Sequence, residues 1–155
     1  CGLALHYEDG PLTKANEPGQ RHGIRPGHRV ETSERTAREH PGWAALRDEL
    51  TDPRWKLLVF AAADGHAEDM VLALKHIDRR HGAVLSVRTV VEGTTSGGIP
   101  HGMLPLADPG GALRRDFAAH SGDFALIRPD GYLAGVGPLR GVSQLTATLR
   151  ACGLT

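Results

Sequence analysis

The chain has 155 residues, of which 40% are hydrophobic and 23% charged, values typical of an ordinary globular protein of one domain. Its 18 basic and 18 acidic side chains give a formal net charge of zero. This balance excludes the strong positive field of a protein that binds nucleic acid or an acidic membrane surface. An aromatic content of 5% also argues against a platform on which bases stack.

The two cysteines, Cys1 and Cys152, lie at opposite ends of the chain and form no Cys-x-x-Cys pair. A secreted protein held by disulfides would carry more cysteines, so we expect a cytoplasmic location. The longest apolar run, Leu57–Ala63, is too short to span a bilayer, and no signal segment opens the chain. Because residue 1 is not Met, we expect that the chain was processed or derives from a longer protein.

The first quarter of the chain differs in composition from the rest. Residues 8–38 are polar and rich in Gly, Pro and charged side chains, with few positions suited to a core. A structureless stretch of this length is unusual inside a compact domain. We therefore predict an extended arm or linker from a preceding domain over residues 1–40, and a folded domain over residues 41–155.

The folded part is predicted to begin with a helix at Pro41, because proline suits the first helical position. Trp43, Leu46 and Leu50 recur at spacings of three and four and form one helix face. The apolar run Leu57–Ala62 then predicts a short strand buried on both faces.

The next helix carries the strongest pattern in the sequence. Asp64 can cap its start, basic side chains fill its last turn, and Gly82 follows as a stop. A second β-branched strand is predicted at Val84–Val91, and the order strand, helix, strand implies that it runs parallel to Leu57–Ala62. The apolar stripe of the helix comprises Ala67, Met70, Val71, Leu74 and Ile77.

A Gly-rich loop, Gly93–Gly102, separates this unit from the rest of the chain, and its role cannot be assigned from sequence. Asp108 and Pro109 then open a short helix that has Leu113 and Phe117 on one side.

The last elements predict a hairpin and a closing helix. Phe124–Ile127 and Leu133–Val136 are expected to pair antiparallel across the turn Arg128–Gly131, which has Pro second and Gly fourth. Ser143 can cap a final helix that ends at Gly153. The whole order predicts an α/β fold of the thioredoxin-like type, with a central mixed sheet and helices on both faces.

Enzymes of the thioredoxin fold place their reactive cysteine after the first core strand, where a helix N-terminus stabilises the thiolate. Here the corresponding stretch, Ala61–His66, contains no cysteine. We therefore expect that the isolated chain neither reduces disulfides nor consumes peroxide.

Other reactive groups give no pattern typical of a site, and we predict no catalytic, cofactor-binding or metal residue in this chain. Cys152 lies on the apolar face of the last helix and is interpreted as a small buried hydrophobe. His76 and His81 are five residues apart, which does not place them together on one helix face as metal ligands. Asp48 and Asp52, with the Glu between them, are interpreted as a solvated helix end.

A glycine pattern, Gly135 and Gly137 followed by Gly141, stands between the last strand and the last helix and invites comparison with a dinucleotide-binding loop. The strand before it returns from a hairpin, no further strand follows, and Pro138 removes a backbone N–H that could hold phosphate. We interpret these residues as turn glycines and expect the isolated chain to bind no flavin.

Two stretches carry a resemblance to a known family. The hairpin motif, residues 123–134 (DFALIRPDGYLA), is similar to the LVRPDGYVAWR hairpin near the end of FAD-dependent aromatic hydroxylases, such as phenol hydroxylase and the polyketide hydroxylases. The arm motif, residues 25–30 (RPGHRV), resembles the RPGxRAPH segment that leads into the C-terminal domain of those enzymes. That C-terminal domain is thioredoxin-like and lacks the cysteines.

The resemblance implies a parent monooxygenase that uses FAD, NAD(P)H and O₂ to hydroxylate an aromatic ring. Its flavin fingerprint is not in this chain, so the implied role is non-catalytic: packing on the flavin-binding and substrate domains, or oligomer contacts. The alternative is a stand-alone protein of the peroxiredoxin or thioredoxin family that lacks the reactive cysteine and acts as a binding module. The aromatic substrate, the pathway and the oligomeric state cannot be inferred from sequence.

Overall fold

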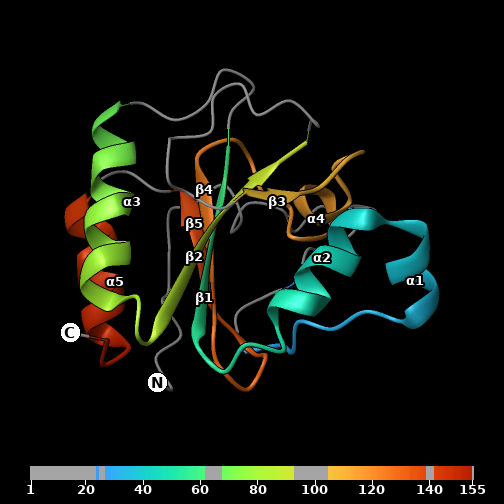
Figure 1. Ribbon diagram of the computed structural model, residues 1–155, viewed down its shortest axis with the longest axis horizontal. Helices are drawn as coiled ribbons and strands as arrows, with labels where there is room; N and C mark the ends of the chain where they lie inside the picture. Colours follow the sequence, from blue (N-terminus) through green and yellow to red (C-terminus); the bar gives the residue numbers. More distant parts are fainter. Residues whose placement is uncertain (1–23, 25–26, 62–67, 93–104, 139–141, 155) are drawn as a thin grey trace, which may run out of the picture.

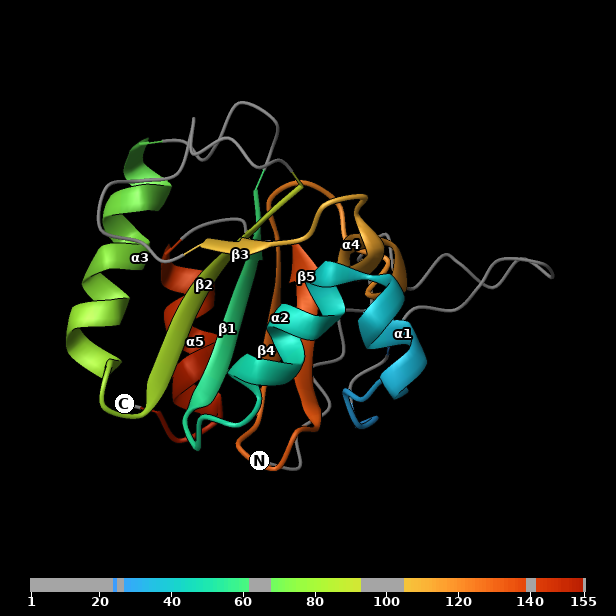
Figure 2. The ribbon, with the colours of Figure 1, turned by 45° about the vertical axis from the view of Figure 1, so that its right-hand side comes forward.

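The computed structural model describes residues 24, 27–61, 68–92, 105–138 and 142–154. A five-stranded mixed sheet of order β3-β2-β1-β4-β5 forms the centre of the molecule (Figure 1). Helices α3 and α5 lie together on one side of it, and α2 and α4 lie on the other (Figure 2). The elements are α1 (Glu34–Glu39), α2 (Pro41–Glu49), β1 (Trp55–Phe60), α3 (Glu68–His81), β2 (Leu85–Val91), β3 (Pro105–Ala107), α4 (Ala112–Asp116), β4 (Asp123–Ile127), β5 (Leu133–Pro138) and α5 (Val142–Ala151).

The central strand, β1, divides the core into two. Successive side chains of a strand point to opposite faces, so Leu58 and Phe60 pack on the α2 and α4 side. Leu57 and Val59 pack on the α3 and α5 side. All four side chains are inaccessible to solvent, as the continuous apolar run predicts.

Pairing of the strands confirms the predicted thioredoxin-like order. β1 runs parallel to β2 and antiparallel to β4, and β4 runs antiparallel to β5. The hairpin closes at Gly131, whose φ of 87° favours glycine and whose N–H donates to the Arg128 carbonyl at 2.9 Å. The bounds differ slightly: β1 begins two residues before the predicted Leu57 and ends at Phe60.

The sequence patterns did not predict strand β3. It has three residues, begins with Pro105, and pairs parallel with β2 at one edge of the sheet. Three residues are too few to create an alternating pattern, and proline is tolerated at the first position of an edge strand. The Gly93–Gly102 loop before it lies outside the described residues.

The prediction of an extended arm over residues 1–40 is wrong for the last part of this range, where residues 34–39 form a helix. Ser33 caps α1, its side chain accepting the Thr36 N–H at 3.1 Å, and α1 places Ala37 in a buried position. Val30, just before the helix, is 3% exposed and belongs to the same core cluster as Leu58. Ordered structure therefore begins before Pro41.

The arm is held to the hairpin by backbone hydrogen bonds. Val30 donates to the Gly131 carbonyl at 2.7 Å, and Gly27 donates to the Leu133 carbonyl at 2.8 Å. Leu133 in turn donates to the His28 carbonyl at 2.9 Å. The two motifs that carry the family resemblance thus pair with each other, and the arm covers part of the β5 edge, which would otherwise present unpaired backbone groups.

Replacing Val30 by Ala should lower the free energy of unfolding by on the order of 2 kcal/mol, because the substitution removes two buried methyl groups from a packed site. Urea denaturation of the purified chain measures the loss. The neighbouring substitution Glu31→Ala, at an exposed side chain, is the control and should leave the midpoint nearly unchanged. Equal midpoints for Val30→Ala and the unmodified chain would contradict the placement of Val30 in the core.

Candidate functional site

The carboxyl end of β1 is the position at which a redox enzyme of this fold would carry its cysteine. Ala61 follows the strand directly and is buried, and its N–H donates to the Val90 carbonyl at 3.0 Å. Residues 62–66 of the predicted stretch lie outside the described residues, and the sequence places no thiol among them. This end of the sheet therefore lacks the nucleophile of thiol chemistry.

Arg114, on α4, occupies this end of the sheet instead. Its guanidinium donates to the Ala61 carbonyl, lies 6.0 Å above the Phe60 ring and donates to Ser121 at 2.9 Å. Its Nε lies 3.4 Å from a carboxylate oxygen of Glu92. The contacts with Phe60, Ala61 and Glu92 join α4 to the ends of β1 and β2, and the contact with Ser121 joins it to the segment before β4, so Arg114 holds these elements together. No pattern in the sequence marks this residue.

Asp108 is a buried carboxylate that stabilises the start of α4. It accepts the backbone N–H groups of Leu113, at 3.0 Å, and Arg114, at 3.3 Å, as a carboxylate at a helix N-terminus should. Gly42 of α2 leaves room for it, because a Cβ at Gly42 would lie 2.0 Å from a carboxylate oxygen of Asp108. The group is enclosed by its partners and has no access to a substrate through them.

Trp43 connects α2 to α4 in the same layer. Its indole N–H donates to Asp116 at 2.7 Å, and its ring stacks on Phe117 with centroids 6.1 Å apart. Phe117 also contacts Phe60 of β1, at 6.0 Å between centroids. This aromatic cluster fills the core, and its one polar atom is satisfied.

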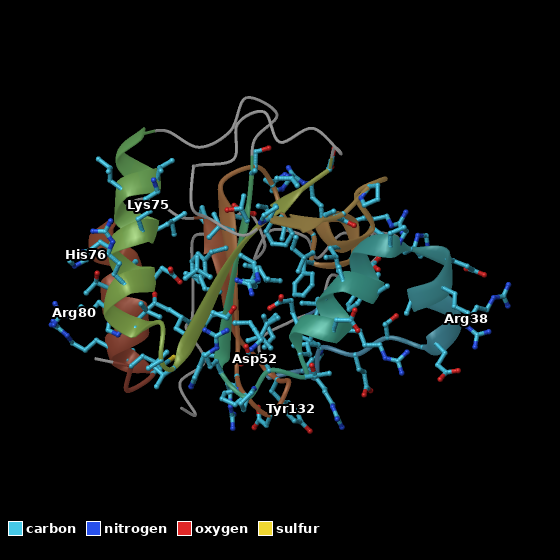
Figure 3. All side chains as sticks on the ribbon, in the orientation of Figure 1. Arg38, Asp52, Lys75, His76, Arg80 and Tyr132 are labelled. Atoms are coloured by element: carbon cyan, nitrogen blue, oxygen red, sulfur yellow. The ribbon has the colours of Figure 1, made fainter. Side chains whose placement is uncertain are left out.

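Two of the three acidic residues predicted to form a solvated helix end, Glu49 and Asp52, are instead paired, whereas Asp48 is exposed. Glu49 accepts from Arg88 of β2 at 3.0 Å. Asp52 accepts from Arg54 at 2.6 Å and lies 3.4 Å from the ammonium of Lys56, near the start of β1 (Figure 3). The solvated interpretation is therefore wrong for Glu49 and Asp52, because basic side chains from later in the chain reach them.

Lys56 is 1% exposed although its side chain ends in an ionisable amine. Its ammonium donates to the carbonyls of Asp52, at 3.0 Å, and Arg54, at 2.9 Å. Burial lowers the pKa of Lys56, while hydrogen bonds from Arg54, with the Lys56 charge nearby, hold the pKa of Asp52 well below its usual range. The cluster is a structural network in which the Lys56 ammonium is buried and hydrogen-bonded, while Asp52 and Arg54 remain partly exposed.

Since the pKa of Asp52 is lower in the folded chain than its ordinary 3.8, its stabilising effect is complete above that value and is lost as the pH falls further. The unmodified chain should therefore lose stability between about pH 4 and pH 2. The Asp52→Asn variant should be less stable than the unmodified chain at pH 7. Its free energy of unfolding should also fall less between pH 7 and pH 3, as measured by urea denaturation at both pH values. Asp48→Asn, at an exposed side chain of the same segment, is the matched control; identical acid profiles for all three chains would refute this role.

The remaining candidates do not converge on a site. Cys152 is half-buried beside the α3 and α5 core, and burial raises the pKa of its thiol, which disfavours the reactive thiolate. His76 lies on the outer surface of α3 with Lys75 and Arg80 (Figure 3). Among the described residues, no group of three or more His, Cys, Asp or Glu side chains could hold a metal ion.

Two glycines of the predicted pattern lie in a strand and do not form a turn. Gly135 and Gly137 are inside β5, opposite Leu126 and Phe124 of β4, and Pro138 ends the strand. Gly141 lies outside the described residues. Gly135 and Gly137 thus belong to a sheet ladder, which differs from the turn that the sequence predicted. No helix in the described part of the chain is long and apolar enough to cross a membrane.

Comparison with solved structures places the fold. The 2-Cys peroxiredoxin of Plasmodium vivax superposes with a TM-score of 0.52 at 17% identity, over 64% of this chain and 77% of that one. Aklavinone-11 hydroxylase, solved as a ternary complex with FAD and aklavinone, gives a TM-score of 0.42 at 25% identity, over 63% of this chain and 16% of that one. The first similarity shows the thioredoxin-like fold; the second, with its lower score, adds nothing to that assignment.

Comparison with sequence families identifies the domain. Residues 29–152 match the HcaD C-terminal domain, and the chain belongs to this family. It is also 46% identical, over 153 residues, to 6-methylpretetramide 4-monooxygenase of Streptomyces rimosus. That match covers 99% of this chain and 25% of the relative, so the chain spans about a quarter of that protein's length. The predicted relationship to the C-terminal domain of the aromatic hydroxylases is confirmed.

Proposed function

We propose that this chain is the non-catalytic C-terminal domain of an FAD-dependent monooxygenase that hydroxylates an aromatic ring, with NAD(P)H as reductant and O₂ as oxidant. The observation that carries the proposal is the 46% identity that extends over nearly the whole chain but over one quarter of a monooxygenase. Flavin, reductant and substrate would be held by the preceding part of the parent protein.

The geometry supports a role without chemistry. At the carboxyl end of β1, Arg114 ties three elements together and no thiol follows the strand. The described carboxylates Asp52 and Asp108 are engaged by hydrogen-bond donors of the chain itself. Because these groups stabilise the fold, the geometry favours a packing domain over an enzyme.

The arm supports a role in positioning. Because Gly27 and Val30 are bonded to the hairpin, the chain that arrives from a preceding domain would be fixed to the sheet before it enters α1. Such an attachment would limit the swing of this domain relative to its neighbour. The alternative, a stand-alone binding module of the peroxiredoxin family without its cysteine, has the fold similarity in its favour but not the family match.

The proposal is tested by comparing the whole parent protein with the isolated 155-residue chain. The parent should purify with bound flavin and oxidise NAD(P)H when an aromatic substrate is present, whereas the isolated chain should be colourless and take up no FAD in a titration. The isolated chain should also give no turnover in insulin-reduction and peroxide assays, with Cys152→Ser as the matched control. Flavin uptake by the chain alone, or peroxide turnover that Cys152→Ser abolishes, would contradict the proposal.

A further inference from the structure

A groove of about 290 Å³ lies where the arm, α2 and the hairpin turn meet. We call it the arm groove. Its lining includes the apolar side chains of Val30, Trp43 and Leu50. A second groove, of about 300 Å³, lies between α1 and α2, and Arg47 lines both. The remaining lining residues of the arm groove are Arg29, Glu31, Thr32, Arg47, Pro129, Asp130 and Gly131.

The charges around the arm groove are unevenly matched. Arg29 lies 3.6 Å from a carboxylate oxygen of Glu31, and Asp130 accepts from Arg128 at 2.7 Å. Arg47 is exposed, and within the described part of the chain no side chain forms an ion pair or hydrogen bond with it. The groove is thus lined mainly by polar side chains, with Leu50 as its partly exposed apolar residue and Arg47 as an unmatched positive charge. An occupant that fits it would carry an apolar side chain and a carboxylate.

The position of the arm indicates the source of the occupant. The chain's family is a C-terminal domain, and the 46% identical relative is about four times as long, so the rest of such a protein precedes this domain. The connection runs through the arm, whose residues Arg29–Thr32 line the groove. In a parent protein of this kind, a preceding domain would be tethered to the arm and would meet the arm groove at a high effective concentration.

We propose that the arm groove is the docking site for the preceding, flavin-binding part of the same polypeptide, which inserts a loop with an apolar side chain over Leu50 and a carboxylate against Arg47. This inference rests on the proposed function and adds to it the surface and the chemistry of the contact. Interfaces between domains of one chain are moderate in area and fairly polar, so the groove is the anchor within a wider contact. A second copy of this chain would be a different occupant.

The test measures how accessible position 47 is in the parent protein and in the isolated chain. Arg47→Cys is made in both, and the rate of maleimide labelling at this position is followed by peptide mass spectrometry, which separates it from other cysteines. Arg150→Cys, at an exposed position of α5 on the other side of the sheet, is the matched control. Circular dichroism checks that each variant is folded, and the flavin absorbance of the parent is recorded with every sample.

The proposal predicts that Arg47→Cys reacts about tenfold more slowly in the parent than in the isolated chain, while Arg150→Cys reacts equally in both. Equal rates at position 47 in a parent that holds its flavin would overturn the docking site and leave the proposed function standing. A parent that binds no flavin would overturn the proposed function and this inference together. Labelling of the isolated chain that slows as its concentration rises would identify a second copy as the occupant and overturn the proposal.

Discussion

The pairing of the arm with the hairpin is the contact on which the described N-terminal part of the domain depends. Three backbone hydrogen bonds join Gly27, His28 and Val30 to Gly131 and Leu133. They cover part of an edge strand and place Val30 in the core beside Leu58. The arm then leads into α1 and α2, which carry Trp43 onto the aromatic cluster. Without this pairing, the ordering of the arm would cost about 1–2 kcal/mol per residue with no compensating contact.

At the carboxyl end of β1, this chain differs from the redox enzymes that share its fold. In redox enzymes of this architecture, a helix N-terminus there activates a thiol. In this chain Arg114 holds the Ala61 carbonyl and the Glu92 carboxylate, and Asp108 caps α4 close to Gly42. The side chains of Arg114 and Asp108, which could otherwise contact a substrate, interact with other groups of the chain. These contacts are consistent with the proposed role as a packing domain, and the chain belongs to a family of C-terminal domains.

Local patterns predicted β1, β2, β4 and β5 because each of these strands carries its own signal, which the three-residue β3 does not. The buried run of β1, the β-branched β2 and the Pro-Asp-Gly hairpin are all legible without knowledge of their neighbours. The arm was mispredicted because backbone hydrogen bonds between residues about one hundred positions apart leave no side-chain signature. Lys56 and Glu49 were missed for a related reason: their burial depends on Asp52 and Arg88, which only the folded chain brings near. Candidate-site residues such as Arg114 act through long-range contacts of the same kind.

Hydrogen exchange of single backbone amides, followed by NMR on the 155-residue chain, tests the pairing of the arm most directly. The amides of Val30 and Leu133 donate to Gly131 and His28, so both should exchange far more slowly than their intrinsic rates. The amide of Glu31, which has an exposed side chain and no backbone bond in the described part of the chain, should exchange quickly and serves as the internal reference. Val30 and Leu133 amides that exchange as fast as that of Glu31 would show that the arm is not part of the domain.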